Sequence, residues 1–237
     1  MSNLENNEKE FDLKISEIEK LRYSDPLKAI YVIDEAKKQF AAKNEQQDLD
    51  TLRELVLIEI KKKNLKTQTS LDTLSLINSL KNKKMDYAFM LIYNELKARE
   101  DLAKYASEFQ YFFNEEGFDA SGFQTLIYDL LSEANIDWEY KIQGKTINPS
   151  KLGSFLKNQD ILKMQNEIIN SFYDDVAKNK IARQVFAAYL FQNWIDILLN
   201  KTNEDYENII NVVKVLYGEQ KPEGLSEKAQ KLYEVFK

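Results

Sequence analysis

Residues 136–149 read IDWEYKIQGKTINP, and this stretch departs from the helical rhythm of the rest of the chain. Apolar side chains occupy every second position from Ile136 to Ile142, and a turn centred on Gly144 leads into a second short run. This pattern predicts a small β-hairpin with one apolar face. Because an isolated two-stranded hairpin is marginally stable in water, we expect Trp138 and its neighbours to pack against flanking helices.

Outside this stretch the apolar residues recur with the period of an amphipathic helix. The 237 residues include only 6 Gly and 3 Pro, too few for the many turns of a β-rich fold. Asp25-Pro26, Asn148-Pro149 and Ser226 are typical helix starts. The predicted fold is therefore all-α, a helical-hairpin array followed by a helical bundle, with one small β-hairpin near residues 136–148. Residues 28–34 (KAIYVID) and 87–93 (YAFMLIY) each have an Ala followed by an apolar face, and they resemble tetratricopeptide-type hairpins, so the array is expected to be tetratricopeptide-like.

Two glycines, Gly117 and Gly122, indicate a joint in the chain. We expect a helical-hairpin array over residues 1–116 and a helical bundle with the inserted β-hairpin over residues 117–237, which could also pack as one body. A long helix over residues 180–200 is apolar most of the way round, which predicts that it is the central helix of the second half.

The composition excludes several classes of chemistry. The chain has no Cys and no His. Disulfides, a thiolate nucleophile, iron–sulfur clusters, the usual zinc sites and Ser-His-Asp catalysis are thereby excluded. We expect no catalytic, cofactor-binding or metal-binding residue, and no cofactor.

Charge and hydropathy indicate the kind of partner. The formal net charge is −6, which argues against nucleic acid or an anionic membrane surface. The first residues, MSNLENNEKEFDLK, lack the features of a signal peptide, and the sequence has no apolar run of about 18 residues. We expect a soluble, cytoplasmic protein with a protein or peptide partner.

A resemblance rests on residues 142–155, IQGKTINPSKLGSF, followed by two long helices. This piece is similar to an uncharacterised all-helical family of mycoplasmas and related low-G+C bacteria. The resemblance implies a tetratricopeptide-like first part. It implies no activity, cofactor or catalytic residue.

Two short motifs match patterns that are found in enzymes. Ser154 and Lys157 match S-x-x-K, but the companion K-T-G and S-D-N elements are missing, so we interpret Ser154 as a capping or surface residue. Tyr93 and Lys97 match Y-x-x-x-K, but no Gly-rich dinucleotide loop accompanies them. An enzyme that uses carboxylates, Lys and Ser stays open as an alternative.

Lysines gather in two places, 61–66 and 81–84. Lysines at the end of a helix interact favourably with its dipole, which explains them without a ligand. A weak phosphate or RNA contact is the alternative, with these lysines as its candidates: Lys61, Lys62, Lys63 and Lys84.

Our main hypothesis is a non-enzymatic helical scaffold or adaptor that binds a protein segment. The partner contact is expected on the helix over residues 85–100, at Tyr87, Tyr93, Asn94 and Lys97. A cleft with clustered, inward-facing Asp and Glu would instead favour the enzyme.

Overall fold

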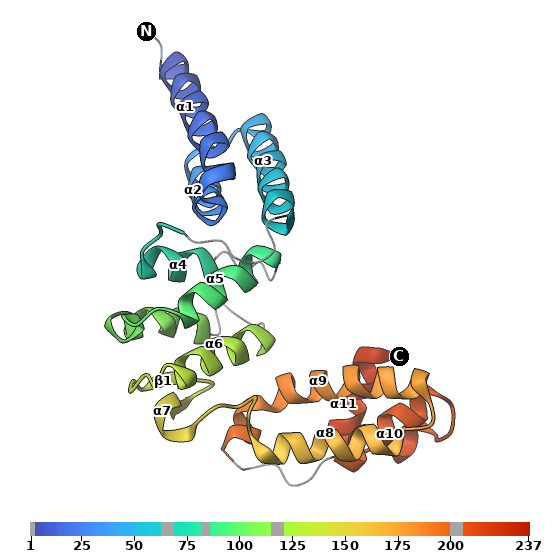
Figure 1. Ribbon diagram of the computed structural model, residues 1–237. Helices are drawn as coiled ribbons and strands as arrows, with labels where there is room; N and C mark the ends of the chain where they lie inside the picture. Colours follow the sequence, from blue (N-terminus) through green and yellow to red (C-terminus); the bar gives the residue numbers. More distant parts are fainter. Residues whose placement is uncertain (1–2, 63–68, 82–85, 115–120, 200–205) are drawn as a thin grey trace. The chain divides into compact units, whose positions relative to one another are not determined.

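The computed structural model describes residues 3–62, 69–81, 86–114, 121–199 and 206–237 (Figure 1). The described chain is helical apart from one two-stranded hairpin, which confirms the predicted all-α fold with a single small β-hairpin. By its internal contacts the chain divides into two compact units, Met1–Phe112 and Phe113–Lys237. The predicted boundary between residues 116 and 117, together with Gly117, lies outside the described residues, and Gly122 lies inside a helix.

The described residues of the first unit form five α-helices and most of a 3₁₀ helix. In chain order they are α1 (Asn3–Ser24), α2 (Pro26–Gln39), α3 (Lys43–Lys62), α4 (Thr73–Leu80), α5 (Tyr87–Lys97) and η1 (Leu102–Phe113). Helices α1, α2 and α3 pack against one another, and α5 packs on α2 and α3. Asp25 begins α2 as the sequence predicts, because its carboxylate accepts a hydrogen bond from the amide of Lys28 while Pro26 occupies the first turn.

The helical period of the sequence also predicts an amphipathic helix over residues 101–116, and the structure differs from it over the described part, 101–114. The observed element is the 3₁₀ helix η1, and its helical geometry is interrupted at Tyr105 (φ −113°, ψ 19°). The buried side chains of Ala106, Phe109 and Phe112 recur every three residues, which matches the three residues per turn of a 3₁₀ helix.

The second unit consists of a hairpin and the remaining helices. They are α6 (Ser121–Glu133), β1 (Tyr140–Ile142), β2 (Lys145–Ile147), α7 (Pro149–Leu152), α8 (Gln159–Ser171), α9 (Val176–Leu198), α10 (Tyr206–Leu216), η2 (Pro222–Gly224) and α11 (Glu227–Phe236). Helix α9 contacts α6, α8, α10 and α11, as expected of the central helix of the second half.

The hairpin forms where the alternating pattern predicts it. Its strands are antiparallel, with Tyr140 opposite Ile147 and Ile142 opposite Lys145. Gln143 and Gly144 both have positive φ, 47° and 72°, as a two-residue hairpin turn requires. Tyr140 is fully buried, its ring centroid 5.3 Å from that of Phe113.

The core of this unit surrounds one tryptophan. Trp194 on α9 is fully buried, and its ring centroid lies 5.6 Å from that of Tyr128 on α6 and 6.3 Å from that of Phe155.

None of the helices in the described part of the chain combines the length and apolar composition that a bilayer span requires.

Candidate functional site

Trp138 is the residue whose place differs most from the sequence expectation. The residue is 44% exposed, so the prediction that it is packed away against the flanking helices is wrong for Trp138, whereas its neighbours Ile136 and Tyr140 are buried as expected. The amide of Trp138 donates to the carbonyl of Ile136 at 3.2 Å, closing a tight turn around Asp137. This turn precedes β1 and interrupts the strand alternation, so Trp138 does not share the buried side of Ile136 and Tyr140.

The exposed indole forms part of a hollow on the second unit. Its volume is about 300 Å³, and it is lined by Asp137, Trp138, Glu139, Asn148 and Lys151. We call these five residues the Trp138 hollow. The first three come from the segment before β1, and the last two from the start of α7.

Asn148 fixes one wall of the Trp138 hollow. It begins α7, with Oδ1 accepting hydrogen bonds from the amide of Ser150 at 3.1 Å and from its hydroxyl at 2.9 Å. Its Nδ2 donates to Oδ1 of Asp137 at 2.6 Å. Because Asn148 is itself buried, its amide holds the Asp137 carboxylate in a defined orientation at the edge of the hollow.

The charged groups of the hollow are two carboxylates, Asp137 and Glu139, and one ammonium, Lys151. Within the described residues, neither Glu139 nor Lys151 has an ion-pair partner, and Asn148 is the hydrogen-bond partner of the Asp137 carboxylate. The hollow therefore combines an open aromatic surface with an excess of negative charge. The indole of such a surface can stack on a planar or cationic group, and the carboxylates can accept hydrogen bonds from the donors of that group.

The residues predicted to contact a partner lie in the first unit, on α5. Asn94 and Lys97 are exposed and Tyr87 is half-buried. Tyr93 is only 7% exposed; its ring stacks on Phe89 at 5.9 Å, and Lys97 Nζ lies 5.8 Å from its centroid. The structure thus presents Tyr87, Asn94 and Lys97 to solvent on this helix, while most of the Tyr93 ring serves packing.

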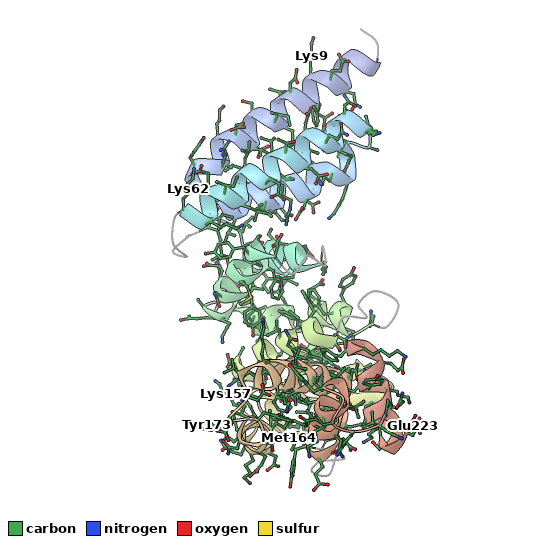
Figure 2. The ribbon with its side chains drawn as sticks, turned by 90° about the vertical axis from the view of Figure 1, so that its right-hand side faces the viewer. Lys9, Lys62, Lys157, Met164, Tyr173 and Glu223 are labelled. Carbon is green, nitrogen blue, oxygen red and sulfur yellow. The ribbon has the colours of Figure 1, made fainter. Side chains whose placement is uncertain are left out.

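The candidate phosphate contacts are described only in part. Lys61 and Lys62 are exposed in the last turn of α3. Lys62 is labelled in Figure 2, and its Nζ lies 3.0 Å from Oε1 of Glu59. Lys63 and Lys84 lie outside the described residues. A phosphate or RNA contact at these lysines stays a prediction.

The S-x-x-K pair has structural partners. Ser154 Oγ accepts a hydrogen bond from the amide of Lys157 at 3.1 Å, as expected for a capping serine. Lys157 Nζ lies 2.8 Å from Oε1 of Glu133. The hydrogen bond to Glu133 raises the pKa of Lys157, which favours the ammonium form over the amine that a general base needs.

A second hollow lies between α8 and α10. Its volume is about 500 Å³, and its lining is mixed: Ser171, Tyr206, Glu207, Ile210, Asn211 and Lys214. Within the described ranges, no three Asp or Glu side chains converge as a metal site would require.

Comparison with models of protein families, with curated proteins and with solved structures found no match to this chain. The resemblance of residues 142–155 to a mycoplasma family therefore stays a prediction. Sequence reasoning also missed the Trp138 hollow, because it assigned Trp138 to the core. The one signal that pointed to a surface position was its pair of acidic neighbours, Asp137 and Glu139.

Proposed function

We propose that this chain is a non-enzymatic helical adaptor that binds a segment of a partner protein, with the Trp138 hollow as a contact site. The observation that carries the proposal is the exposed indole of Trp138 inside a hollow of about 300 Å³. Tryptophan is enriched among residues that dominate binding energy at protein interfaces, because it offers a large, rigid surface together with an N–H donor.

The rest of the hollow supports the same function. Asp137 is held by the buried Asn148, so part of the polar lining is already oriented before a partner arrives. A preorganised site loses less conformational entropy on binding. On α5, the exposed Asn94 and Lys97 with the half-buried Tyr87 offer a second contact surface for the same adaptor function.

The test is an affinity measurement. Partners captured by the purified chain are identified, produced separately and titrated by calorimetry against the wild type and Trp138→Ala. We expect Trp138→Ala to weaken the binding of a specific partner at least about tenfold, the effect of a residue that contributes at least about 1.4 kcal/mol.

The control is Tyr173→Ala, because Tyr173 is also exposed on the second unit, 79% by accessible surface (Figure 2). It should leave the affinity unchanged. A double variant, Tyr87→Ala with Lys97→Ala, tests the α5 surface separately. Unchanged affinity in both Trp138→Ala and the double variant would contradict the adaptor proposal at these surfaces.

A further inference from the structure

We infer that the Trp138 hollow receives the guanidinium group of an arginine from the partner segment. This inference rests on the proposed function and adds the chemistry of the occupant. It follows from three features of the hollow: an indole that is 44% exposed, a carboxylate held by a buried amide, and an excess of negative charge.

The indole supplies the first half of the recognition. A cation above the face of an aromatic ring is attracted by the ring quadrupole, and tryptophan is the best of the aromatic side chains for this interaction. Trp138 is exposed enough for a group to lie against it, whereas Trp194, in the same unit, is fully buried.

Asp137 supplies the second half. Asn148 Nδ2 bonds to Oδ1 of Asp137 at 2.6 Å, and within the described residues Oδ2 has no such partner. A guanidinium group stacked on the indole can donate an N–H to this oxygen while a second N–H is directed to Glu139. Arginine suits this geometry better than lysine, because the guanidinium group is planar, carries five donors and is weakly hydrated.

The charge balance decides the sign of the ligand. The lining carries two carboxylates against the single ammonium of Lys151, and the whole chain has a formal charge of −6. The negative charge of the hollow and that of the whole chain would both repel an anionic ligand, whereas they attract a basic segment at long range. Lys151 then acts against the bound arginine, so its removal should strengthen binding.

The experiment uses the full chain and two small probes, N-acetylarginine amide and its neutral analogue N-acetylcitrulline amide. The readout is the two indole N–H signals in a ¹H–¹⁵N spectrum, assigned with Trp138→Phe and Trp194→Phe. We expect the arginine probe to shift the Trp138 signal saturably, with an affinity in the millimolar range for such a small ligand. The Trp194 signal should stay in place.

Variants of the charged groups sharpen the test. Asp137→Asn with Glu139→Gln should weaken binding of the arginine probe at least about fivefold, since the charge-assisted hydrogen bonds are lost. Lys151→Gln should tighten it about twofold, since a like charge is removed. A site for anions would behave in the opposite way, so weaker binding in Lys151→Gln overturns the inference.

Other outcomes are equally decisive. Two results would overturn the guanidinium assignment. One is an equal shift of the Trp138 signal with the arginine and citrulline probes. The other is no shift of this signal up to about 50 mM probe, a concentration far above the millimolar affinities of small ligands. If that happens while Trp138→Ala still weakens the protein partner, the adaptor proposal stands and only its arginine chemistry fails. Unchanged circular dichroism in each variant confirms that the fold is intact.

Discussion

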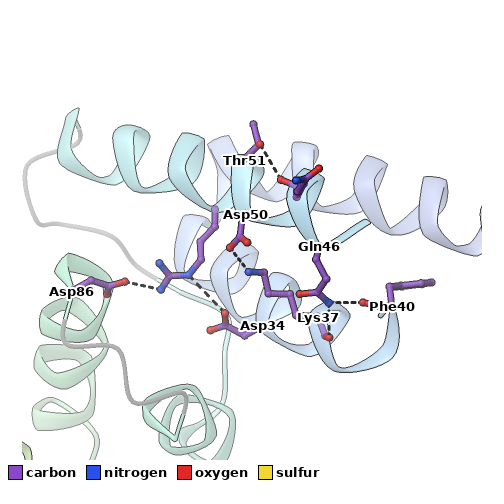
Figure 3. A network of polar contacts seen from close by, with 9 residues as sticks. Asp34, Lys37, Phe40, Gln46, Asp50, Thr51 and Asp86 are labelled. Carbon is purple, nitrogen blue, oxygen red and sulfur yellow. Dashed lines mark hydrogen bonds and ion pairs between the residues drawn. The ribbon is translucent and has the colours of Figure 1, made fainter. Parts of the chain in front are cut away.

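Nη2 of Arg53 donates a hydrogen bond to Oδ2 of Asp86 at 2.6 Å, and this contact joins α3 to the start of α5. Figure 3 labels Asp86 and Asp34, the two carboxylates that Arg53 contacts. Asp86 is also the residue that caps α5, because its Oδ1 accepts from the amide of Phe89 at 3.1 Å. On the other side, Nε of Arg53 forms an ion pair with Asp34 of α2 at 3.7 Å. One buried guanidinium group therefore connects three helices of the first unit.

Arginine is rare in this chain, with four residues among the 33 basic ones. Arg53 is buried, and Arg22 and Arg99 also take part in ion pairs with partly buried side chains. A guanidinium group is more weakly hydrated than an ammonium and bonds two partners at once, so it is the better cation for such positions. By contrast, the pair of Lys38 with Glu35 is exposed.

Replacing Arg53 by Ala should destabilise the first unit strongly. The change removes the Arg53 cation from Asp34 and Asp86, and removing one partner of a buried ion pair costs about 3–5 kcal/mol. We expect the lower part of that range, because the Asp86 side chain is 27% exposed. Chemical denaturation followed by circular dichroism measures it. The control, Lys38→Ala, removes an exposed cation of the same unit and should stay within about 0.5 kcal/mol of wild type. If Arg53→Ala lowers the free energy of unfolding as little as the control does, the ion pairs of Arg53 contribute little to stability.

Replacing Asp129 by Asn should destabilise the second unit. The buried Asp129 carboxylate accepts hydrogen bonds from the amides of Phe155 at 2.7 Å and Leu156 at 3.0 Å, fixing the chain after α7. An Asn side chain has a single acceptor oxygen, so one of the two amides loses its partner, at about 1–3 kcal/mol. Denaturation followed by tryptophan fluorescence measures the effect, since both tryptophans lie in this unit. Asp174→Asn, at an exposed position, is the control and should change little.

The same substitution should have a pH-dependent effect. Burial raises the pKa of Asp129 above the ordinary 3.8, although the amides of Leu156 and Phe155 oppose the shift. The folded state thus binds the proton more tightly than the unfolded state. Protonation of Asp129 therefore stabilises the folded state. This stabilisation is fully present below about pH 3.8, the ordinary pKa of the group, and is lost as the pH rises through the folded-state pKa. The destabilisation by Asp129→Asn should therefore shrink between about pH 3.5 and pH 7. A difference that grows over this interval would contradict the raised pKa.

Replacing Gly153 by Ala should cost about 1–3 kcal/mol. Gly153 ends α7 at φ 78° and ψ −177°, a conformation that is essentially restricted to glycine. A Cβ at this position meets no atom within 4 Å, so the cost is backbone strain alone. Gly224→Ala is a matched control, because its Cβ also meets open space but its φ is not positive. Equal unfolding midpoints for the two variants would show that residue 153 relaxes into another conformation.

The two tryptophans should give separable fluorescence. In Trp194→Phe the remaining Trp138 is exposed, so we expect red-shifted emission that acrylamide quenches efficiently. In Trp138→Phe the remaining Trp194 is fully buried, so its emission should be blue-shifted and quenched several-fold less. Similar quenching constants in the two variants would place Trp138 in the core, as the sequence alone suggests, and would remove the basis for the Trp138 hollow.

Local sequence was sufficient wherever the deciding contacts lie within a few residues. Asp25, Asn148 and Ser226 cap the helices that they precede, because each side chain bonds an amide two or three residues ahead. The turn at Gln143 and Gly144 likewise fixes the hairpin register. The predicted all-α fold and its single hairpin follow from such short-range signals.

Only the tertiary structure decided which of the similar residues are buried. Trp138 and Trp194 both lie in apolar patterns, yet one is 44% exposed and the other fully buried. Asp129 and Arg53 resemble other charged residues of the chain, but their partners lie 26 and 33 positions away, at Phe155 and Asp86. Their burial depends on the packing of whole helices, and the free energy of that packing is not contained in any local stretch of sequence.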